Sequence, residues 1–333
     1  MSNKTIYGLT VGISRYTHLR KLAAAAGDAK DVAAVIRSGA IPSTVKELID
    51  KKATKSAILK ELSWLAKTAG PQDTVIIHLS GHGGRYSETS EQAYFCPVES
   101  SSRYPARSGL SSKELTTALR AIRSERLVVL IDACHAGGIG QARDNAGPLA
   151  KLTSRDVEDL VKGEGRMIMA ASRPDESAWE VPEMRNGLFT NYLLAALRGA
   201  VARADGSIWA NDVFSYVTRN ILEHELQRPY QKANGEDFVV LMQNKESVSS
   251  RTAAAAAPGR FGQYGLRHAL RKAYNRAEFE RVCRDIGLDL EEDVKGGTFE
   301  TQLMHVIDHC VRHKLFDKLI ERVRLDHADF ATG

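Results

Sequence analysis

Two residues in this chain have the types and the setting needed for nucleophilic chemistry. Cys134 follows the apolar run Leu127–Ile131 in LVVLIDACHAGG, and His82 follows a second apolar run in TVIIHLSGHGG. A thiol becomes a nucleophile when a nearby imidazole raises its thiolate fraction, and attack on a carbonyl also needs donors for the developing oxyanion. These residues predict a Cys–His dyad, with His82 as general base and acid and Cys134 as nucleophile. The backbone amides of Gly83 and Cys134 are predicted to form the oxyanion hole.

Buried strands are the elements that must position this pair. Both apolar runs are short, rich in β-branched residues and bounded by charge or glycine, which is typical of inner strands of a parallel sheet. Ligands and chemistry in open α/β sheets lie at the carboxyl ends of the strands, where both residues stand. Further strands are predicted at 6–13, 45–49, 93–98, 167–172 and 237–242, with helices between them. The alternation predicts an α/β fold with a mostly parallel sheet and helices on both faces.

Capping signals mark the start of two of these helices. Thr54 is predicted to cap a helix that runs to Lys67, because its hydroxyl can accept from a free backbone amide of the first turn. Ser111 and Glu114 form the pattern of a capping box for a helix that runs to Ile122.

Bulk composition excludes several classes of protein. The chain has 333 residues, 43% apolar and 26% charged, which fits a globular protein of two domains rather than a disordered or membrane protein. The net charge of +5 is dispersed, so no nucleic-acid partner is predicted, and no apolar run is long enough for a membrane span. The four cysteines show no CxxC spacing and the N-terminus lacks a signal-peptide pattern, so we expect a cytoplasmic protein.

A change in composition divides the chain after residue 243. Residues 1–243 carry the strand and helix alternation, and residues 244–262 are small, polar and alanine-rich, which predicts a linker. Residues 263–333 show helical periodicity in every segment, so we predict a small all-α domain with short connections.

The first part of the chain resembles the caspase superfamily, and its metacaspase and bacterial caspase-like members more than animal caspases. The resemblance covers residues 5–242 and rests on HLSGHGG, on LIDACHAGG, on AASRPDESAWE followed by NGLFTNYLL, and on LAAAAGDA. In the caspase pattern the histidine also lies roughly 50 residues before the cysteine. The resemblance implies a caspase fold and a cysteine endopeptidase that uses a Cys–His dyad.

The same resemblance implies which residues select the substrate. Animal caspases carry glutamine two positions before the catalytic cysteine, where this chain has Asp132. Metacaspases cleave after Arg or Lys, and their specificity pocket maps here to Asp132, Ser80 and Asp28. Two carboxylates favour a guanidinium through charge-assisted hydrogen bonds, which agrees with that specificity. The metacaspase helix motif has glycine and cysteine where this chain has Ala24 and Ala25.

Calcium is the one cofactor that the resemblance raises. Metacaspases that need calcium bind it through acids after the histidine motif, where this chain offers Glu88, Glu91 and Glu99 without an aspartate-rich loop. The correspondence fails residue by residue, so we predict neither a metal site nor a cofactor. Calcium binding is kept only as an alternative.

The C-terminal helical segment resembles the death-like or effector-associated adaptor domains that are fused to bacterial caspase-like proteases. This resemblance implies a partner protein that carries a like helical domain. The chain as a whole is therefore interpreted as a caspase-like endopeptidase that cleaves protein or peptide substrates after Arg or Lys, is recruited by its adaptor domain, and serves bacterial signalling or defence.

Two alternatives remain. The chain could be a non-enzymatic caspase-fold scaffold for homotypic assembly, although the intact His82 and Cys134 argue against it. It could also be an Arg-specific Cys–His protease outside the caspase line, although the helical adaptor favours that line. A long polar stretch after Gly138 contains four basic residues at which we expect self-cleavage: Arg143, Lys151, Arg155 and Lys162.

Overall fold

The computed structural model describes residues 4–85, 93–101, 104–135, 165–171, 186–222, 229–243, 270–271, 273–289, 299–312 and 315–327. They fall into two compact units, Met1–Thr252 and Ala253–Gly333. The predicted boundaries at 243/244 and 262/263 stay a prediction, because residues 244–269 lie outside the described ranges. The four expected self-cleavage positions lie outside them as well.

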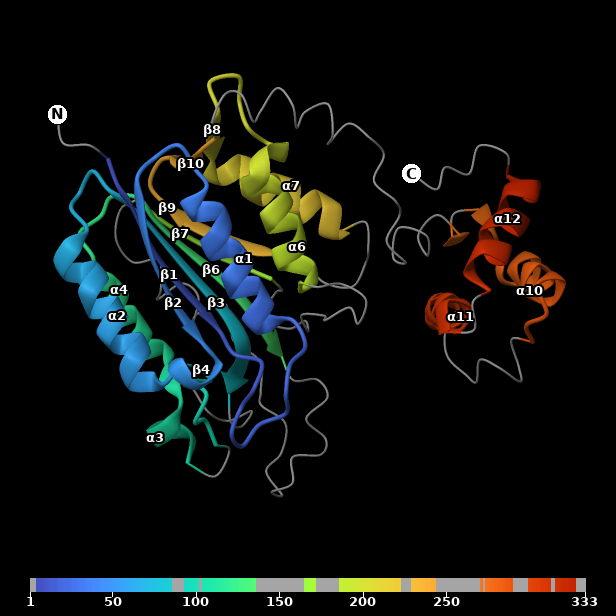
Figure 1. The fold of residues 1–333 in the computed structure, drawn as a ribbon, viewed down its shortest axis with the longest axis horizontal. Coiled ribbons are helices and arrows are strands. Elements are labelled where there is room, and N and C mark those ends of the chain that lie inside the picture. Colours follow the sequence, from blue (N-terminus) through green and yellow to red (C-terminus); the bar gives the residue numbers. More distant parts are fainter. Residues whose placement is uncertain are drawn as a thin grey trace. The chain divides into compact units, whose positions relative to one another are not determined.

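A mostly parallel sheet forms the centre of the first unit (Figure 1). Its strands run in the order β2-β1-β3-β6-β7-β9, in which β9 alone is antiparallel to its neighbour. The bounds are β1 Ile6–Gly12, β2 Ser43–Ile49, β3 Thr74–Arg85, β6 Leu127–His135, β7 Arg166–Ala170 and β9 Tyr230–Asn234. The short strands β4 (Ala93–Phe95) and β5 (Leu110–Ser111) extend the far end of β3 in antiparallel fashion.

Helices cover both faces of this sheet, as predicted (Figure 1). One face carries α2 (Lys55–Thr68) and α4 (Ser112–Arg120), and the other carries α1 (Ala25–Arg37), α6 (Leu188–Ala195) and α7 (Ala210–Leu222). Shorter turns lie at Asp50–Lys52, Pro105–Ser108 (α3) and Ala196–Ala200. The α/β fold class is thereby confirmed.

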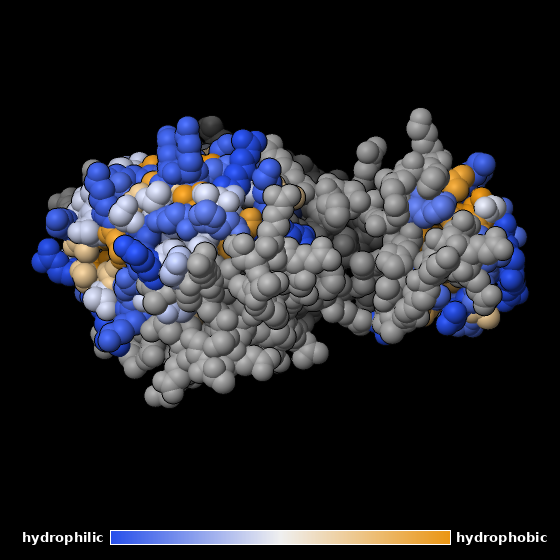
Figure 2. Space-filling model, turned by 90° about the horizontal axis from the view of Figure 1, so that it is seen from below, coloured by the Kyte–Doolittle hydropathy of each residue, from blue (hydrophilic) through white to orange (hydrophobic). Residues whose placement is uncertain are grey.

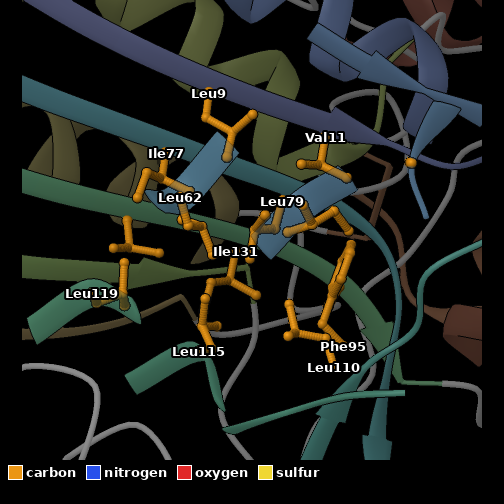
Figure 3. Packing of buried hydrophobic residues seen from close by; sticks show 14 of the residues in the cluster. Leu9, Val11, Leu62, Ile77, Leu79, Phe95, Leu110, Leu115, Leu119 and Ile131 are labelled. Atoms are coloured by element: carbon orange, nitrogen blue, oxygen red, sulfur yellow. The ribbon is translucent and has the colours of Figure 1, made fainter. Parts of the chain in front are cut away.

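Alternation along the inner strands supplies two separate cores. Ile77, Leu79 and Ile131 pack beneath α2 and α4, where they share a cluster with Leu62 and Leu119 (Figure 3). The intervening strand residues point to the opposite face and pack with α1, α6 and α7. Full burial of such a side chain contributes about 1.5–3 kcal/mol, and a shift by one residue would exchange the two sets. This burial fixes the register between β3 and β6.

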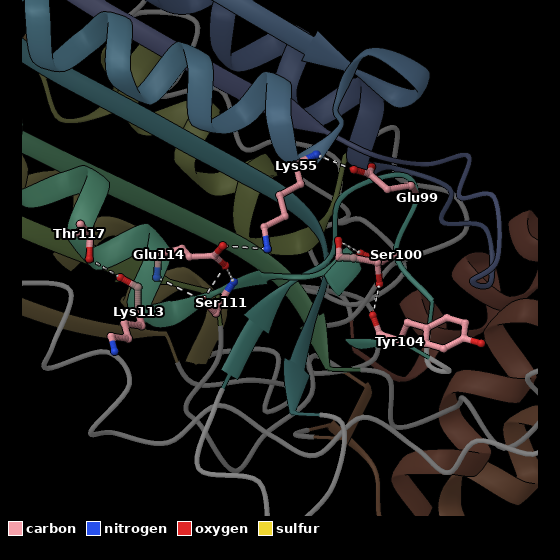
Figure 4. Close-up of polar contacts among 9 residues, drawn as sticks. Lys55, Glu99, Ser100, Tyr104, Ser111, Lys113, Glu114 and Thr117 are labelled. Carbon is pink, nitrogen blue, oxygen red and sulfur yellow. Dashed lines mark hydrogen bonds and ion pairs between the residues drawn. The ribbon is translucent and has the colours of Figure 1, made fainter. Parts of the chain in front are cut away.

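Both predicted helix starts are confirmed. The Thr54 hydroxyl accepts a hydrogen bond from the Ala57 amide at 3.2 Å, and α2 begins at the next residue. Ser111 and Glu114 form the full capping box of α4, which ends at Arg120, two residues before the predicted end. Lys55 joins the two helices, since its Nζ lies 2.8 Å from the carboxylate of Glu114 (Figure 4).

Two strand assignments differ from the sequence prediction. The segment predicted at 237–242 forms β10 (Val239–Met242), which pairs with β8 (Ser207–Trp209) in a separate two-stranded antiparallel sheet. The main sheet ends instead at β9, whose sequence YQKAN is polar because the strand lies at an edge and is partly exposed. An apolar run alone does not reveal which sheet a strand joins.

In its described residues, the second unit is built from helices, as predicted. The described part contains α10 (Arg276–Asp285), α11 (Phe299–Arg312) and α12 (Phe316–Asp326), which share one apolar core. Cys283 and Cys310 lie in that core, where burial raises the pKa of Cys283 to about 12 and that of Cys310 to about 11.

The described surface is mainly hydrophilic. In the face shown in Figure 2, hydrophobic residues occur in small groups among hydrophilic ones. Tyr104 and Leu325 are the large apolar side chains that are exposed in the described ranges. No helix within those ranges has the length and apolar character needed to cross a membrane.

Candidate active site

The carboxyl ends of β3 and β6 bring the residues of the predicted dyad to neighbouring backbone positions. The two strands pair in parallel, with His82 opposite Cys134 and Ser80 opposite Asp132. Adjacent strands lie about 4.8 Å apart, so this register sets the two dyad positions side by side. Gly83 occupies the next register position, opposite His135. The side chains of Cys134 and His135 lie outside the described part of the structure.

His82 is buried and held from two directions. Its backbone amide donates to the Tyr16 hydroxyl at 2.7 Å, and the Tyr16 ring lies against the imidazole with centroids 4.8 Å apart. Its Nε2 lies 2.8 Å from the carbonyl oxygen of Arg20. A carbonyl can only accept, so Nε2 carries the proton, and Nδ1 is then the basic nitrogen of the neutral ring.

The loop that supplies these contacts is anchored at Asp50. The carboxylate of Asp50 accepts hydrogen bonds from the backbone amides of Ser14 and Arg15 at 2.8 and 2.9 Å. Asp50 has a φ of 48°, a left-handed conformation that Asp and Asn tolerate better than most residues. The anchor fixes the path of the chain toward Tyr16 and Arg20.

Two glycines of SGHGG are required by close approach. A Cβ added to Gly81 would lie 2.5 Å from the Tyr16 hydroxyl oxygen, and one added to Gly83 would lie 3.0 Å from the Cβ of Ala133. A side chain at Gly81 would displace Tyr16, and one at Gly83 would require Ala133 on β6 to shift by a few tenths of an ångström.

The structure also brings together Asp28, Ser80 and Asp132, here termed the acidic cluster. Asp28 lies on α1 and is buried. Its Oδ2 accepts from the Ser80 hydroxyl at 3.1 Å, and its Oδ1 accepts from the Gly187 amide and the Asn186 side-chain amide, both at 3.0 Å. Two segments distant in the sequence, β3 and the residues before α6, therefore converge on this carboxylate of α1.

Asp132 is the second buried acid of the cluster. Its Oδ2 accepts from the Thr190 hydroxyl at 2.6 Å. Burial, followed by the negative charge of Asp132, raises the pKa of Asp28 to about 8, while the hydrogen bonds from Asn186, Gly187 and Ser80 oppose that rise. The pair thus favours a proton on Asp28, or a cation in its place.

His78 lies next to Thr190, so that His78, Thr190 and Asp132 form a chain of hydrogen bonds. It is fully buried, and this burial lowers its pKa to about 3, so the ring is neutral at physiological pH. Thr190 Oγ1 lies 3.4 Å from His78 Nε2. Because the Thr190 proton is directed to Asp132, Nε2–H of His78 is the donor to Thr190.

Five contributors to this region were not assigned from the sequence: Tyr16, His78, Asn186, Gly187 and Thr190. His78 shares a face of β3 with Ser80 and His82, because strand side chains alternate with a period of two. The spacing in HLSGH could therefore have identified His78 from the sequence. The other four lie in segments whose spatial neighbours no local pattern reveals.

The candidate calcium ligands receive no support as a set. Glu88 and Glu91 lie outside the described residues. Glu99 is held through one carboxylate oxygen, Oε1, which accepts from the Lys55 amide at 2.8 Å at the start of α2 (Figure 4). Within the described ranges, no three His, Cys, Asp or Glu residues are grouped so that they could hold a metal ion.

Comparison with known proteins gives a separate family match for each of the two units. Residues 7–244 match the family model of the caspase domain, and residues 266–325 match that of effector-associated domain 7. Both parts of the resemblance found in the sequence are thereby confirmed. The crystal structure of a Geobacter sulfurreducens protein, 19% identical, superposes with a TM-score of 0.54 over 72% of this chain and 97% of that one, which supports the fold.

Curated relatives match over shorter stretches. Metacaspase-3 of Trypanosoma cruzi is 28% identical over 149 residues, which are 40% of this chain and 41% of the relative. Metacaspase-1B of Aspergillus fumigatus is 35% identical over 92 residues, 25% of this chain and 22% of the relative. The chain thus spans less than half the length of these relatives.

Proposed function

The chain belongs to the caspase family of cysteine peptidases, and from this premise we propose that it is a metacaspase-type endopeptidase that cleaves after Arg or Lys. The observation that carries the specificity is the acidic cluster, in which Asp132 lies two residues before Cys134 on β6 and the buried carboxylate of Asp28 comes from α1. A substrate guanidinium or ammonium stabilises the ionised form of these acids, whereas an aspartate side chain would add a further acidic group beside them.

The proposed chemistry uses His82 and Cys134. The Cys134 thiol gives its proton to Nδ1 of His82, and the sulfur attacks the carbonyl carbon of the scissile peptide bond. The oxyanion is stabilised by the amides of Gly83 and Cys134. The C–N bond then breaks, and the imidazolium gives its proton to the departing amine. Water, deprotonated by His82, hydrolyses the thioester and restores the thiol.

Tyr16 and the Arg20 carbonyl support this exchange as positioning groups. The carbonyl keeps the Nε2–H tautomer and is well placed to stabilise the imidazolium, since it accepts the hydrogen bond from the charged ring. A general base placed in this way contributes about 10²- to 10⁴-fold to rate.

A panel of fluorogenic peptides with Arg, Lys, Leu or Asp at the cleavage position tests the proposal. The wild type is expected to cleave Arg and Lys peptides, Cys134→Ala to cleave none, and Asp132→Asn to lose at least about 100-fold in kcat/KM for Arg peptides. Alkylation of Cys134 by iodoacetamide is the control, because this small reagent needs the thiolate but no cation site. Preference for Asp would contradict the proposed specificity, and inactivity on every peptide would favour the scaffold alternative.

The second unit is proposed to recruit the protease. Its match to an effector-associated domain supports binding to a partner protein that carries a like helical domain. A cytoplasmic location and a role in bacterial signalling or defence are proposed on the same resemblance.

A further inference from the structure

Gly187, the residue before α6, stands between the two acids of the cluster. A Cβ added to Gly187 would lie 3.0 Å from Oδ2 of Asp132 and 3.4 Å from Oδ2 of Asp28. Its own backbone amide donates to Oδ1 of Asp28 at 3.0 Å. One residue thus donates to one acid and lies against the carboxylates of both.

The backbone conformation does not require glycine here. Gly187 has φ −57° and ψ 152°, values that any L-residue adopts without strain. Helix capping does not require it either, because serine at the N-cap position is preferred over glycine. The feature that only glycine supplies is the missing side chain beside the two carboxylates.

We propose that Gly187 is a specificity-determining residue of the protease, since its missing side chain leaves room for the guanidinium of an arginine substrate to contact both Asp28 and Asp132. The inference rests on the proposed cleavage after basic residues. A methyl group at this position would lie against one oxygen of each acid and would obstruct the donors that must reach them. The planar, wider guanidinium needs more of this space than an ammonium group, so the loss is larger for Arg than for Lys.

Substitutions at Gly187 test the proposal against a matched control. Gly187→Ala and Gly187→Ser are expected to lose about 10- to 100-fold in kcat/KM for Arg peptides, with a smaller loss for Lys peptides. Gly70→Ala is the control, because the Gly70 amide also donates to a carboxylate, Asp73 Oδ2 at 2.8 Å, and an added Cβ would meet that oxygen at 3.5 Å. The control is expected to match the wild type, and all variants are expected to be alkylated by iodoacetamide at the wild-type rate.

The serine variant separates the proposed role from helix capping. If Gly187 served only as a cap, Gly187→Ser would keep full activity on Arg peptides, and this result would overturn the proposal. Equal losses for Arg, Lys and alkylation would overturn it too, because they would indicate a general distortion. A wild type that prefers Asp peptides would instead refute the proposed specificity on which the inference rests, before any variant is compared.

A second experiment changes the substrate instead of the protein, so it tests the proposal even if the variants do not fold. The wild type is given peptides with arginine or Nω-methylarginine at the cleavage position, so that the extra methyl group comes from the ligand. We expect kcat/KM to fall by at least about 10-fold for the methylated peptide. Equal cleavage of the two peptides would overturn the proposal.

Discussion

At the scale of single residues, Asp28 links substrate binding to pH. Its pKa of about 8 means that the free protein holds a proton on this acid at pH 7, whereas a bound guanidinium favours the ionised form. Binding therefore releases a proton, and affinity for a basic substrate rises as pH increases through the pKa of Asp28. Among the described residues, the other groups that face Asp28 are the Asp132 carboxylate and the donors Ser80, Asn186 and Gly187.

We expect kcat/KM for Arg peptides to rise from pH 6 to pH 8.5 and then to level off. Asp28→Asn removes the titrating group, so the variant is expected to cleave more slowly and to lose this part of the rise. The pH profile of iodoacetamide alkylation reports the titration of the dyad alone and is subtracted as the control. Identical profiles for the wild type and Asp28→Asn, after that correction, would show that Asp28 does not titrate in this range.

At the scale of elements, the first turn of α6 orients the second acid. Thr190 donates to Asp132 and is backed by His78 on β3, so a helix and a strand jointly hold one carboxylate. Removal of the hydroxyl takes away the hydrogen bond by which α6 orients Asp132 toward the substrate.

Thr190→Val is accordingly expected to raise KM for Arg peptides by about 10-fold, which corresponds to the loss of a hydrogen bond to a charged group. Thr190→Ser retains the hydroxyl and should restore most of the affinity, which a purely structural role for Thr190 would not predict. Unchanged KM in the valine variant would show that Asp132 is held without Thr190.

Some strands and helix caps could be predicted from the sequence, and others could not. The strands that carry His82 and Cys134 could be predicted, because buried strands have a period that sequence preserves, and the caps at Thr54 and Ser111 could be predicted, because capping is local. The polar edge strand β9 and the separate β8–β10 sheet could not, because pairing depends on distant partners.

The same distinction applies to the candidate site. Asp28, Ser80 and Asp132 followed from a family resemblance and do converge in the structure. Gly187 and Thr190 belong to the quoted motif NGLFTNYLL, yet their contacts with acids on α1 and β6 join segments far apart in the chain. The role of a glycine such as Gly187 can be inferred only when its spatial neighbours are known.

At the scale of the whole molecule, each unit has a core of its own, so the peptidase should not need the adaptor in order to fold. A chain that ends at residue 252 is expected to cleave peptides within about twofold of the full-length rate and to lose partner binding. Full-length Cys134→Ala is the complementary control, since it should bind the partner without cleavage. A truncated chain that is insoluble or inactive would show that the units depend on each other.

The buried thiols of the adaptor unit have a consequence for oxidative stress. Cys283 and Cys310 are shielded and have raised pKa values, so they supply almost no thiolate to peroxides at neutral pH. A reactive Cys134 would be oxidised first, and such a chain would keep an intact adaptor. We therefore expect oxidised molecules to bind the proposed partner without cleaving substrate. They would then compete with active molecules and act as dominant inhibitors.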